Sequence, residues 1–504
     1  MPQKIVSAGE MRGIDSALVD RLAVPALLLM ENAAFGVTKA LSESGCCDGR
    51  ALVVCGTGNN GGDGLAVLRQ HIANGHEGDA LLIGSPDRFS GNARVQWEML
   101  EKAGVPVRPV EKPGDLEAAA GLFDKAGCIV DALFGTGLSR PAEGLHRTAI
   151  EMMNASGKPV VAVDVPSGVE SDTGRVRGAA VRAEVTVTFQ YPKPGHFLFP
   201  GKTHTGRLIV HAIAIVPPRL HDAIELERLV EFDVRALLPP RPADAHKGSF
   251  GRAGIVAGSM GMAGAGVMCA RAALKAGAGL VTLCSSEELG PVYQAALPEA
   301  MFIPLLSFFD EPEFLDFVRK CTAVAIGPGL GRAPHVLRAV EAVLTTDDLP
   351  AVVDADALNT LSEAGRIPPV RGKAVFTPHV GEMARLCGLS AAEVLQDPIG
   401  CAKKYAREWN AVVVLKSAAT VVAHPDGRAC INATGTPAMA KGGTGDVLCG
   451  LIAALMAQGL RPYAAASLGC HLLGLAGVHA ENSVGAYGVL SSEIADALSL
   501  IMQR

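Results

Sequence analysis

Lys441-Gly442-Gly443-Thr444-Gly445-Asp446 is the stretch from which the fold of the second half of this sequence is predicted most directly. Apolar residues follow it at helical spacing from Val447 to Met456, so the glycines lie where a helix begins. A helix N-terminus has unpaired N–H groups and a partial positive charge, and glycines let its backbone close on a phosphate. The stretch therefore predicts an anion site. An ordinary capped core helix is the alternative, because a carboxylate is common in a first turn.

The composition is typical of a compact protein of two to three domains, with 504 residues, 49% of them hydrophobic and 58 of them glycine. Aromatic residues make up 4% of the chain and the net charge is −6, so neither stacking platforms nor a basic surface for nucleic acid are expected. The 12 cysteines include no Cys-x-x-Cys pair, and the adjacent Cys46-Cys47 lacks metal-ligand spacing. We therefore expect reduced thiols and no nucleic-acid partner.

The sequence predicts neither a secretory signal nor a membrane span. Residues 1–5 contain no apolar core of a signal peptide. The most apolar stretch, residues 447–460, is short for a bilayer, and Arg461-Pro462 separates it from the next apolar segment. Buried helices and a cytoplasmic location are the expectation.

The first half begins as a dinucleotide-binding domain would. Residues 7–43 read as helical, residues 51–55 as a buried strand, and a helix is expected from Leu65 to about Asn74. The loop between strand and helix, residues 56–64, is rich in glycine, which is the dinucleotide-binding layout. It departs from the usual fingerprint because Asn59, Asn60 and Asp63 place polar side chains in the loop itself.

Two further strands of the first half, residues 128–130 and 160–163, run into Asp131 and Asp164, and Ser167 follows the second of them. The carboxyl ends of parallel strands meet at one edge of a sheet, so these residues and Asn60 are expected to converge on one crevice. Oxygen donors of this kind suit a hard cation rather than zinc. Each aspartate taken alone is more often a turn former.

A domain boundary is expected where the composition becomes charged and rich in proline. Residues 184–190 and 207–216 read as the last strands of the first domain. We place the first domain at residues 1–216, a linker at 217–242 and the second domain at 243–504.

The second half alternates apolar strands with helical segments, which predicts a second parallel α/β layer. The expected strands are 254–259, 280–284, 323–326, 351–353, 374–376 and 411–415. The polar residues again lie at strand ends, in the segments 327–331, 354–356, 377–382 and 416–420. His379 belongs to this set and is therefore a candidate for a substrate contact, whereas by itself it would be read as a core histidine.

The motifs of the two halves, taken together, resemble those of the bifunctional NAD(P)H-hydrate repair enzymes, in which an epimerase domain is fused to a dehydratase domain. In the first half these motifs are Asn59-Asn60-Gly61-Gly62-Asp63-Gly64 and Asp164-Val165-Pro166-Ser167-Gly168. In the second half they are His246-Lys247-Gly248, Ala257-Gly258-Ser259, Gly327-Pro328-Gly329-Leu330-Gly331, Thr377-Pro378-His379 and Gly443-Thr444-Gly445-Asp446. The resemblance implies an α/β protein with an N-terminal Rossmann-like three-layer sandwich and a C-terminal ribokinase-like three-layer sandwich.

The resemblance also implies the substrates and the residues that bind them. The substrates would be NADH and NADPH hydrated at C6 of the nicotinamide ring, with the epimerase interconverting the R and S hydrates and the dehydratase using ADP to act on the S hydrate. Substrate contacts are implied at Asn59, Asn60, Gly61, Gly62, Asp63, Gly135, Thr136, Gly137, Leu138, Ser139, Arg140, Pro141, Asp164, Ala253, Gly329, His379 and Asp446. Nucleotide contacts are implied at Lys416, Ser417, Ala418, Ala419, Thr420 and Gly445. A potassium ion is implied at Asn60, Asp131 and Ser167, a magnesium ion in the dehydratase domain, and a homo-oligomer as the assembly.

Two residues depart from the family pattern. Thr57 stands where proline is expected, which alters the stiffness of the loop more than its chemistry. Ser417 stands where glycine is expected in the nucleotide loop, and its Cβ puts the phosphate geometry there in question.

Asp446 and Asp164 are the predicted catalytic residues. The ring hydroxyl leaves poorly, and its phosphorylation would solve this, with Asp446 as general base and the glycine backbone stabilising the transferred phosphoryl group. Asp164 is the candidate acid/base of the epimerase. The alternative is a vitamin-type kinase fused to a non-catalytic nucleotide-binding domain, which explains Asp446 but leaves Asn59–Asp63 without a role.

Overall fold

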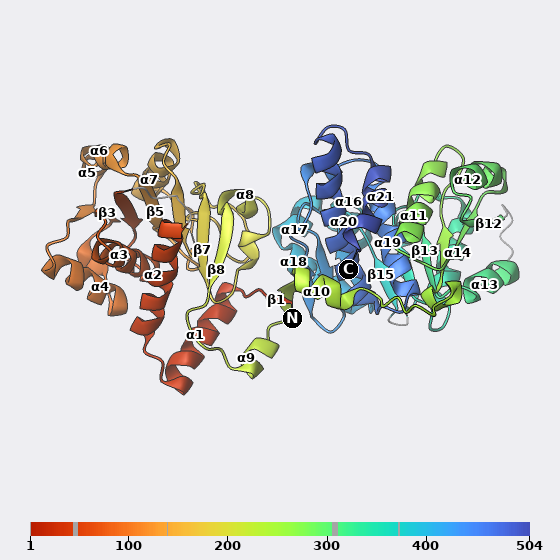
Figure 1. The fold of residues 1–504 in the computed structure, drawn as a ribbon, viewed down its shortest axis with the longest axis horizontal. Helices are drawn as coiled ribbons and strands as arrows, with labels where there is room; N and C mark the ends of the chain where they lie inside the picture. The colour runs from red at the N-terminus through yellow and green to blue at the C-terminus, as the bar shows by residue number, and fades with distance from the viewer. Residues whose placement is uncertain (1, 44–48, 139, 305–310, 371–372, 504) are drawn as a thin grey trace. The chain divides into compact units, whose positions relative to one another are not determined.

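The computed structural model of the protein describes residues 2–43, 49–138, 140–304, 311–370 and 373–503. The chain folds into two compact units, one formed by Lys4–Ile224 and the other by Glu225–Arg504 together with Met1–Gln3. Each unit contains its own sheet (Figure 1).

The N-terminal unit is built on a seven-stranded parallel sheet in the order β4-β3-β2-β5-β6-β7-β8. Its strands are β2 (Ala51–Cys55), β3 (Gly78–Ile83), β4 (Val107–Val110), β5 (Cys128–Ala132), β6 (Val160–Val163), β7 (Val185–Phe189) and β8 (Arg207–His211). Its longer helices are α1 (Ala8–Leu22), α2 (Ala26–Glu43), α3 (Asn59–Ala73), α4 (Gly91–Lys102) and α7 (Gly144–Ala155), and its shorter ones are α5 (Pro113–Ala118), α6 (Ala120–Lys125), α8 (Gly201–Thr205) and α9 (Pro218–Asp222). The chain reverses its direction of progress between β2 and β5, and such a switch point is where ligands bind in open parallel sheets.

Alternate residues of the central strand β2 face two different cores, which makes this unit a three-layer sandwich. Val53 and Cys55 pack with α1 to α4, whereas Leu52 and Val54 pack with α5 to α7. Figure 1 shows these two groups of helices on opposite sides of the sheet. The strands are therefore apolar on both faces, as parallel strands covered by helices must be. The predicted Rossmann-like α/β architecture is confirmed.

Two helix boundaries differ from the prediction. The helical region 7–43 divides into α1 and α2 at Ala23, which has a left-handed backbone (φ 54°), shortly before Pro25. The helix α3 begins at Asn59 rather than Leu65, because Gly61 allows its first turn to close on the end of β2. A Cβ at Gly61 would lie 1.8 Å from the carbonyl oxygen of Gly56, so only glycine fits there.

The C-terminal unit is built on a sheet in the order β1-β9-β18-β17-β16-β15-β14-β13-β10-β11-β12. Its strands are β1 (Gln3–Lys4), β9 (Leu226–Arg228), β10 (Arg252–Val256), β11 (Leu280–Ser285), β12 (Met301–Pro304), β13 (Ala323–Ile326), β14 (Ala351–Val353), β15 (Ala374–Phe376), β16 (Val412–Leu415), β17 (Val421–Ala423) and β18 (Ala429–Ile431). The neighbouring strands β16-β15-β14-β13-β10-β11-β12 are parallel to one another, and β17 runs antiparallel to both β16 and β18.

The helices of this unit cover both faces of the sheet. They are α10 (Glu231–Leu237), α11 (Ala263–Lys275), α12 (Gly290–Ala296), α13 (Glu311–Arg319), α14 (Pro334–Thr345), α15 (Asp356–Ala364), α16 (Val380–Cys387), α17 (Ala391–Gln396), α18 (Pro398–Trp409), α19 (Thr444–Ala457), α20 (Pro462–Val484) and α21 (Ser491–Ile501). Ala253 and Ile255 of β10 lie in the core formed with α11, α19, α20 and α21, whereas a Cβ at Gly254 would meet Phe317 of α13. The predicted second three-layer α/β unit is confirmed.

The segment 217–242, expected as a linker, contains regular structure that belongs to both units. The division falls between Ile224 and Glu225. Beyond it, β9 pairs with β18 through Leu226 and Ala429, and α10 adds Val234 to the core of the C-terminal unit. These contacts join residues about 200 positions apart, so the local composition, which is charged and rich in proline, does not show them.

The described residues contain no helix that is long and apolar enough to cross a membrane. Nine cysteines in the described part of the chain are free, in agreement with the expected reduced thiols, but Cys128 at the start of β5 is disulfide-bonded. Cys46 and Cys47 lie outside the described residues.

Candidate active sites

A cavity of about 1060 Å³ lies at the carboxyl edge of the sheet in the N-terminal unit. It is lined by residues that follow β2, β3, β5, β6 and β7 and by residues of α1 and α3, so it spans the switch point of the sheet. Of the predicted substrate residues, the ones that line it are Asn59, Asn60, Asp63, Gly135, Thr136, Gly137, Arg140 and Asp164. The structure therefore brings most of the predicted site into one place.

The remaining predicted substrate residues of this unit do not line the cavity. Gly61 and Gly62 are buried in the first turns of α3, where a Cβ at Gly62 would meet Ala93 and Met30. Leu138 and Pro141 are not among the lining residues, and Ser139 lies outside the described residues. The close packing of the two glycines places α3 against its neighbours.

Asp164 is held in an unusual conformation directly after β6. Its backbone is left-handed (φ 65°), which residues with a Cβ rarely adopt and which is typical of functional sites. Its Oδ1 lies 2.5 Å from the Nζ of Lys193, and Thr188 donates a hydrogen bond to the same oxygen. Although burial raises the pKa of Asp164, the charge and hydrogen bond of Lys193 outweigh it and lower the pKa below its usual value. Asp164 is therefore ionised.

His196 supports this pair from behind. Burial and the charge of Lys193 lower the pKa of His196 to about 4, so its ring is neutral. Its Nδ1 accepts a hydrogen bond from the backbone N–H of Lys193, and its Nε2 lies 2.9 Å from the carbonyl oxygen of Asp164. Nε2 is therefore the N–H donor, and the ring ties the two ends of the ion pair together.

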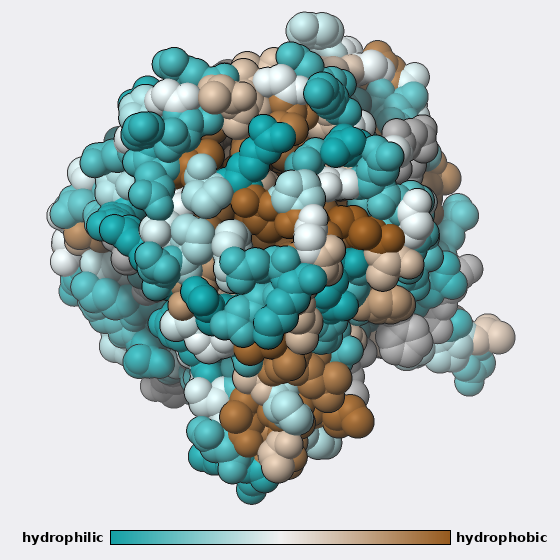
Figure 2. Space-filling view, turned by 90° about the vertical axis from the view of Figure 1, so that its left-hand side faces the viewer, coloured by the Kyte–Doolittle hydropathy of each residue, from teal (hydrophilic) through white to brown (hydrophobic). Residues whose placement is uncertain are grey.

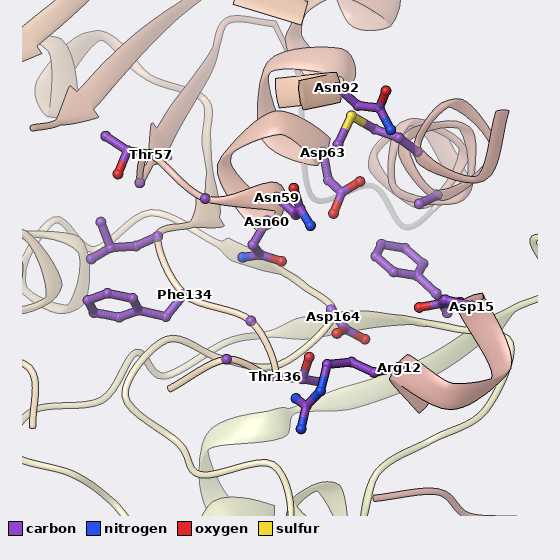
Figure 3. Close-up of a pocket in the computed structure, with 18 of the residues that line it drawn as sticks. Arg12, Asp15, Thr57, Asn59, Asn60, Asp63, Asn92, Phe134, Thr136 and Asp164 are labelled. Atoms are coloured by element: carbon purple, nitrogen blue, oxygen red, sulfur yellow. The ribbon is translucent and has the colours of Figure 1, made fainter. Parts of the chain in front are cut away.

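Two further carboxyl groups face Asp164 across the cavity (Figure 3). Asp63 projects from the first turns of α3, and Asp15 projects from α1. Burial, with the negative charges of Asp164 and Asp15, raises the pKa of Asp63 well above its usual range. Burial raises the pKa of Asp15 to about 6. One ionised carboxylate, one carboxyl group that retains its proton and a third that titrates near pH 6 thus share one hollow, which is the arrangement of an acid/base site.

The predicted cation residues lie beside this cluster. Asp131 accepts hydrogen bonds from the backbone N–H and the hydroxyl of Ser167, at 2.8 and 2.5 Å. Asn60 faces Gly135, because a Cβ there would lie 2.9 Å from the Asn60 Oδ1. Burial raises the pKa of Asp131 to about 6, since no cationic side chain acts on it. A buried carboxylate among neutral oxygens is compensated well by a monovalent cation, so these residues fit one chemically.

Lys193, Asp15 and His196 belong to this acidic cluster or support it, and the sequence did not single them out. Lys193 lies in the turn Tyr191-Pro192-Lys193-Pro194-Gly195, which reads as an ordinary connection between strands. Asp15 lies on an amphipathic helix, where a polar residue is expected to face solvent. A lysine between two prolines was the one available signal in the sequence, and its burial became visible only in the structure.

In the C-terminal unit, Asp446 lies in the first turn of α19, as predicted. Gly443 caps this helix with a left-handed backbone (φ 93°) and without a side-chain hydrogen bond, so the first N–H groups remain available for an anion. The loop is anchored by Ser491, which donates to the carbonyl oxygen of Gly442. Burial and the charge of Asp354 raise the pKa of Asp446 to about 7. Asp446 is thus suited to exchange protons near neutral pH.

Lys416 lies beside Asp446 in a buried ionic group at the ends of β14 and β16. Its Nζ lies 2.6 Å from the Oδ1 of Asp354 and 4.0 Å from the Oε2 of Glu382. Burial favours the neutral amine, but Asp354 and Glu382 raise the pKa of Lys416. A Cβ at Gly445 would lie 3.4 Å from the same Nζ, so the lysine reaches the anion loop. The predicted nucleotide residues Lys416 and Gly445 are therefore neighbours.

The remaining predicted substrate residues of this unit, His379, Gly329 and Ala253, lie in different surroundings. His379 caps α16 through its Nδ1, and its side chain is 53% exposed, which excludes the reading of a core histidine. Gly329 has a left-handed backbone (φ 58°) and its carbonyl oxygen accepts a hydrogen bond from Ser259. Ala253 is the second residue of β10 and fully buried, toward the strand end opposite the polar edge.

Ser417 turns its hydroxyl inward within the nucleotide loop. It donates a hydrogen bond to the carbonyl oxygen of Ala419 and accepts one from the Ala419 N–H. Thr420 closes the turn by donating to the carbonyl oxygen of Ser417, while Ala418 is exposed. The serine thus stabilises the turn locally.

Comparisons with known proteins match both halves of the chain. A family model described as NAD(P)H-hydrate dehydratase matches residues 253–500, and one described as YjeF-related protein N-terminus matches residues 26–195. The bifunctional NAD(P)H-hydrate repair enzyme of Moorella thermoacetica is 40% identical to this chain over 99% of this chain and 97% of its own. The chain belongs to the family of bifunctional NAD(P)H-hydrate repair enzymes.

Another repair enzyme of this family, from Escherichia coli, is 38% identical over 90% of this chain and 84% of its own. Among solved structures, an ADP/ATP-dependent NAD(P)H-hydrate dehydratase from Bacillus subtilis, co-crystallised with ATP and Mg²⁺, is 35% identical with a TM-score of 0.51. It covers 55% of this chain and 98% of its own. A ribokinase-like superfamily protein from Enterococcus faecalis is 28% identical with a TM-score of 0.51. The resemblance of the C-terminal unit to ribokinase-like enzymes is confirmed.

Proposed function

We propose that the C-terminal unit dehydrates the S hydrates of NADH and NADPH with ADP as phosphoryl donor, and that the N-terminal unit interconverts the R and S hydrates. The observation that carries this proposal is the position of Asp446, a carboxyl group with a pKa of about 7 in the first turn of an uncapped helix. A base and a phosphate cradle occur there together.

In the proposed dehydration, ionised Asp446 accepts the proton of the ring hydroxyl. The hydroxyl oxygen at the same time attacks the terminal phosphorus of ADP. The bond from that phosphorus to the bridging oxygen breaks, and AMP leaves. The N–H groups at the start of α19 stabilise charge on the transferred group, and Lys416 adds a positive charge beside Gly445. The ring carbon next to C6 then loses a proton as phosphate departs, which restores the dihydronicotinamide.

Mg²⁺ fits this unit as a companion of the nucleotide. The described residues contain no group of three His, Cys, Asp or Glu side chains that could hold a metal ion, and Asp354 is engaged by Lys416. A magnesium ion commonly binds through substrate phosphates, one or two carboxylates and water. When bound, it would neutralise phosphate charge.

For the epimerase, we propose Asp164 as base and Asp63 as acid. Inversion at C6 requires the bond from C6 to the hydroxyl oxygen to break and to form again on the other face of the ring. Asp63 donates a proton to the departing hydroxyl, which leaves as water, and Asp164 accepts a proton from the water that adds back. Asp164 is held ionised by Lys193, and Asp63 retains its proton because of burial and its acidic neighbours. A potassium ion at Asn60, Asp131 and Ser167 would compensate the buried carboxylate of Asp131 and hold the loop beside the substrate.

The dehydratase proposal is tested by following reduced-nicotinamide absorbance after ADP and Mg²⁺ are added to a mixture of R and S hydrates. Full recovery is expected with potassium present, because epimerisation feeds the S hydrate to the dehydratase. Asp446→Asn should reduce turnover by about 100-fold or more, and the wild-type rate should rise with pH through about 7 as Asp446 ionises. Near-normal dehydration by the variant would refute this role. A lasting phosphorylated product would instead favour the alternative of a vitamin-type kinase.

The epimerase proposal is tested by NMR of R and S interconversion with ADP omitted. Asp164→Ala should abolish interconversion, whereas Asp124→Asn, an exposed aspartate of α6, should leave it unchanged. Interconversion at the normal rate in the Asp164→Ala variant would refute the assignment of Asp164 as the base. Replacement of potassium by sodium should slow the reaction, and equal rates in both salts would exclude the cation site.

We also propose that the protein is a homo-oligomer. The corner between α1 and α2 exposes Leu22 and Leu28, and Phe35 of α2 is 57% exposed. Figure 2, in which the N-terminal unit faces the viewer, shows hydrophobic side chains gathered at the bottom of the view. Analytical ultracentrifugation tests this, with Leu28→Glu expected to dissociate the assembly. A monomeric wild-type protein would contradict it.

A further inference from the structure

Three basic side chains of the N-terminal unit face one part of its cavity, and the epimerase chemistry leaves them unused. Arg88 follows β3, Arg140 follows β5, and His146 lies in the first turn of α7. Neither guanidinium forms an ion pair or side-chain hydrogen bond with any described residue. Two unpaired arginines that line a cavity are typical of a site for an anion.

The three groups lie close enough to act on one another. Burial and the positive charges of Arg140 and Arg88 lower the pKa of His146. The imidazole is stacked on the ring of Phe134, with centroids 5.0 Å apart, which fixes its plane at the cavity wall. A neutral imidazole still has one N–H group to donate. The positive charges of Arg88 and Arg140 are compensated when an anion binds beside them.

The acidic cluster lies at the other part of the same cavity. Asp164 follows β6 and Lys193 follows β7, whereas Arg88 follows β3. Because β2 and β5 separate β3 from β6, the two strand ends lie about 14 Å apart. At this end Lys193 is already paired with Asp164, and the acidic side chains of Asp63 and Asp15 disfavour phosphate, although Arg12 also lines the cavity here. The end with Arg88 and Arg140 is therefore better suited to phosphate, and the acidic end to the uncharged hydrate ring.

We propose that Arg88, Arg140 and His146 form the phosphate subsite of the epimerase, and that they orient the dinucleotide with its hydrate ring against Asp164. This inference rests on the proposed epimerase function. Ser85 and the uncapped N-terminus of α3 at Gly58 also line the cavity and offer further donors. The acidic residue on this side of the cavity is Glu111, which follows β4 at the edge of the sheet.

The subsite could bind either the pyrophosphate, which NADH and NADPH share, or the 2′-phosphate, which only NADPH carries. The two sources predict different results. If the subsite binds the pyrophosphate, substitution of its residues should weaken the binding of both dinucleotides. If it binds the 2′-phosphate, substitution should weaken the binding of the 2′-phosphorylated dinucleotide alone.

The test is calorimetric titration of the full-length protein with NAD⁺ and NADP⁺, combined with the epimerase KM and kcat for both hydrates. Arg88→Gln and His146→Gln remove one contact each. Arg147→Gln is the matched control, because Arg147 is the neighbour of His146 on α7, pairs with Glu151 at the surface and does not line the cavity. Binding in the C-terminal unit is the same in every variant and cancels in the comparison.

Arg88→Gln should weaken binding and raise KM about tenfold or more, with kcat nearly unchanged, because a lost charged hydrogen bond is distant from the acidic cluster. The wild-type affinity should fall with added salt, and less so in the variant. Arg147→Gln should bind as the wild type does. Affinities for both dinucleotides that match the control in both variants would overturn the subsite. If binding weakens as expected but the wild type does not epimerise, the proposed function fails while the subsite stands.

Discussion

Replacement of Lys193 by methionine tests the electrostatic arrangement of the epimerase site most directly. The Lys193 side chain is 1% exposed and that of Asp164 is 12% exposed, so water and salt screen their interaction weakly. The Nζ lies 2.5 Å from the Oδ1 of Asp164 and 2.9 Å from the Oγ1 of Thr188. Methionine keeps the length of the side chain and removes the charge.

The expected cost follows from leaving Asp164 buried without its counter-charge. Removing one partner of a buried ion pair destabilises a protein by about 3–5 kcal/mol. In the wild type Lys193 holds the pKa of Asp164 below its usual value, so the pair contributes stability above pH 4 and loses it only in strong acid. In Lys193→Met burial raises that pKa instead. The deficit should therefore be largest at pH 8 and shrink as pH falls toward 5 and Asp164 takes up a proton.

Urea unfolding can be assigned to this unit because the chain has two tryptophans, Trp97 in the N-terminal unit and Trp409 in the C-terminal one. In a Trp409→Phe background the fluorescence of Trp97, which is buried between the helices and Phe89, reports the N-terminal unit alone. Lys125→Met, at an exposed position of α6, is the control and should change stability by less than about 0.5 kcal/mol. A deficit below about 1 kcal/mol at pH 8, or one that does not vary with pH, would refute the reasoning.

Two further substitutions test other parts of the structure. Asp15→Asn should stabilise the N-terminal unit by about 1–3 kcal/mol at pH 8, because the Asp15 carboxyl group, with a pKa of about 6, costs stability when it ionises. This gain should vanish at pH 4. An equal gain at both pH values, measured by urea unfolding, would contradict the prediction. Gly450→Ala should destabilise the C-terminal unit by about 3 kcal/mol, because the added Cβ would lie 1.9 Å from the carbonyl oxygen of Cys269 on α11. Gly264→Ala on α11, where nothing lies within 4 Å, is the control, and equal Trp409 unfolding curves would show that the two helices can separate at no cost.

The sequence by itself determined the alternation of strands and helices and the polar residues at their ends. Apolar runs such as residues 51–55 and 323–326 are strands because a strand covered on both faces must be apolar throughout, and this signal is local. The same holds for the glycines before Asp446, which mark the start of α19. These features require only neighbours in the chain, so a single sequence is sufficient to predict them.

Only the tertiary structure decided the chemistry of those residues. Asp131 is the fourth residue of β5 and Asp164 directly follows the neighbouring strand β6, yet one is bonded to Ser167 and the other is paired with Lys193. Asp15 enters the same cavity from a helix that precedes the sheet. A pKa depends on burial and on charges brought close by folding, and these groups are separated by tens to hundreds of residues along the chain. Composition and periodicity carry no record of such distances, because they describe each segment with its immediate neighbours alone.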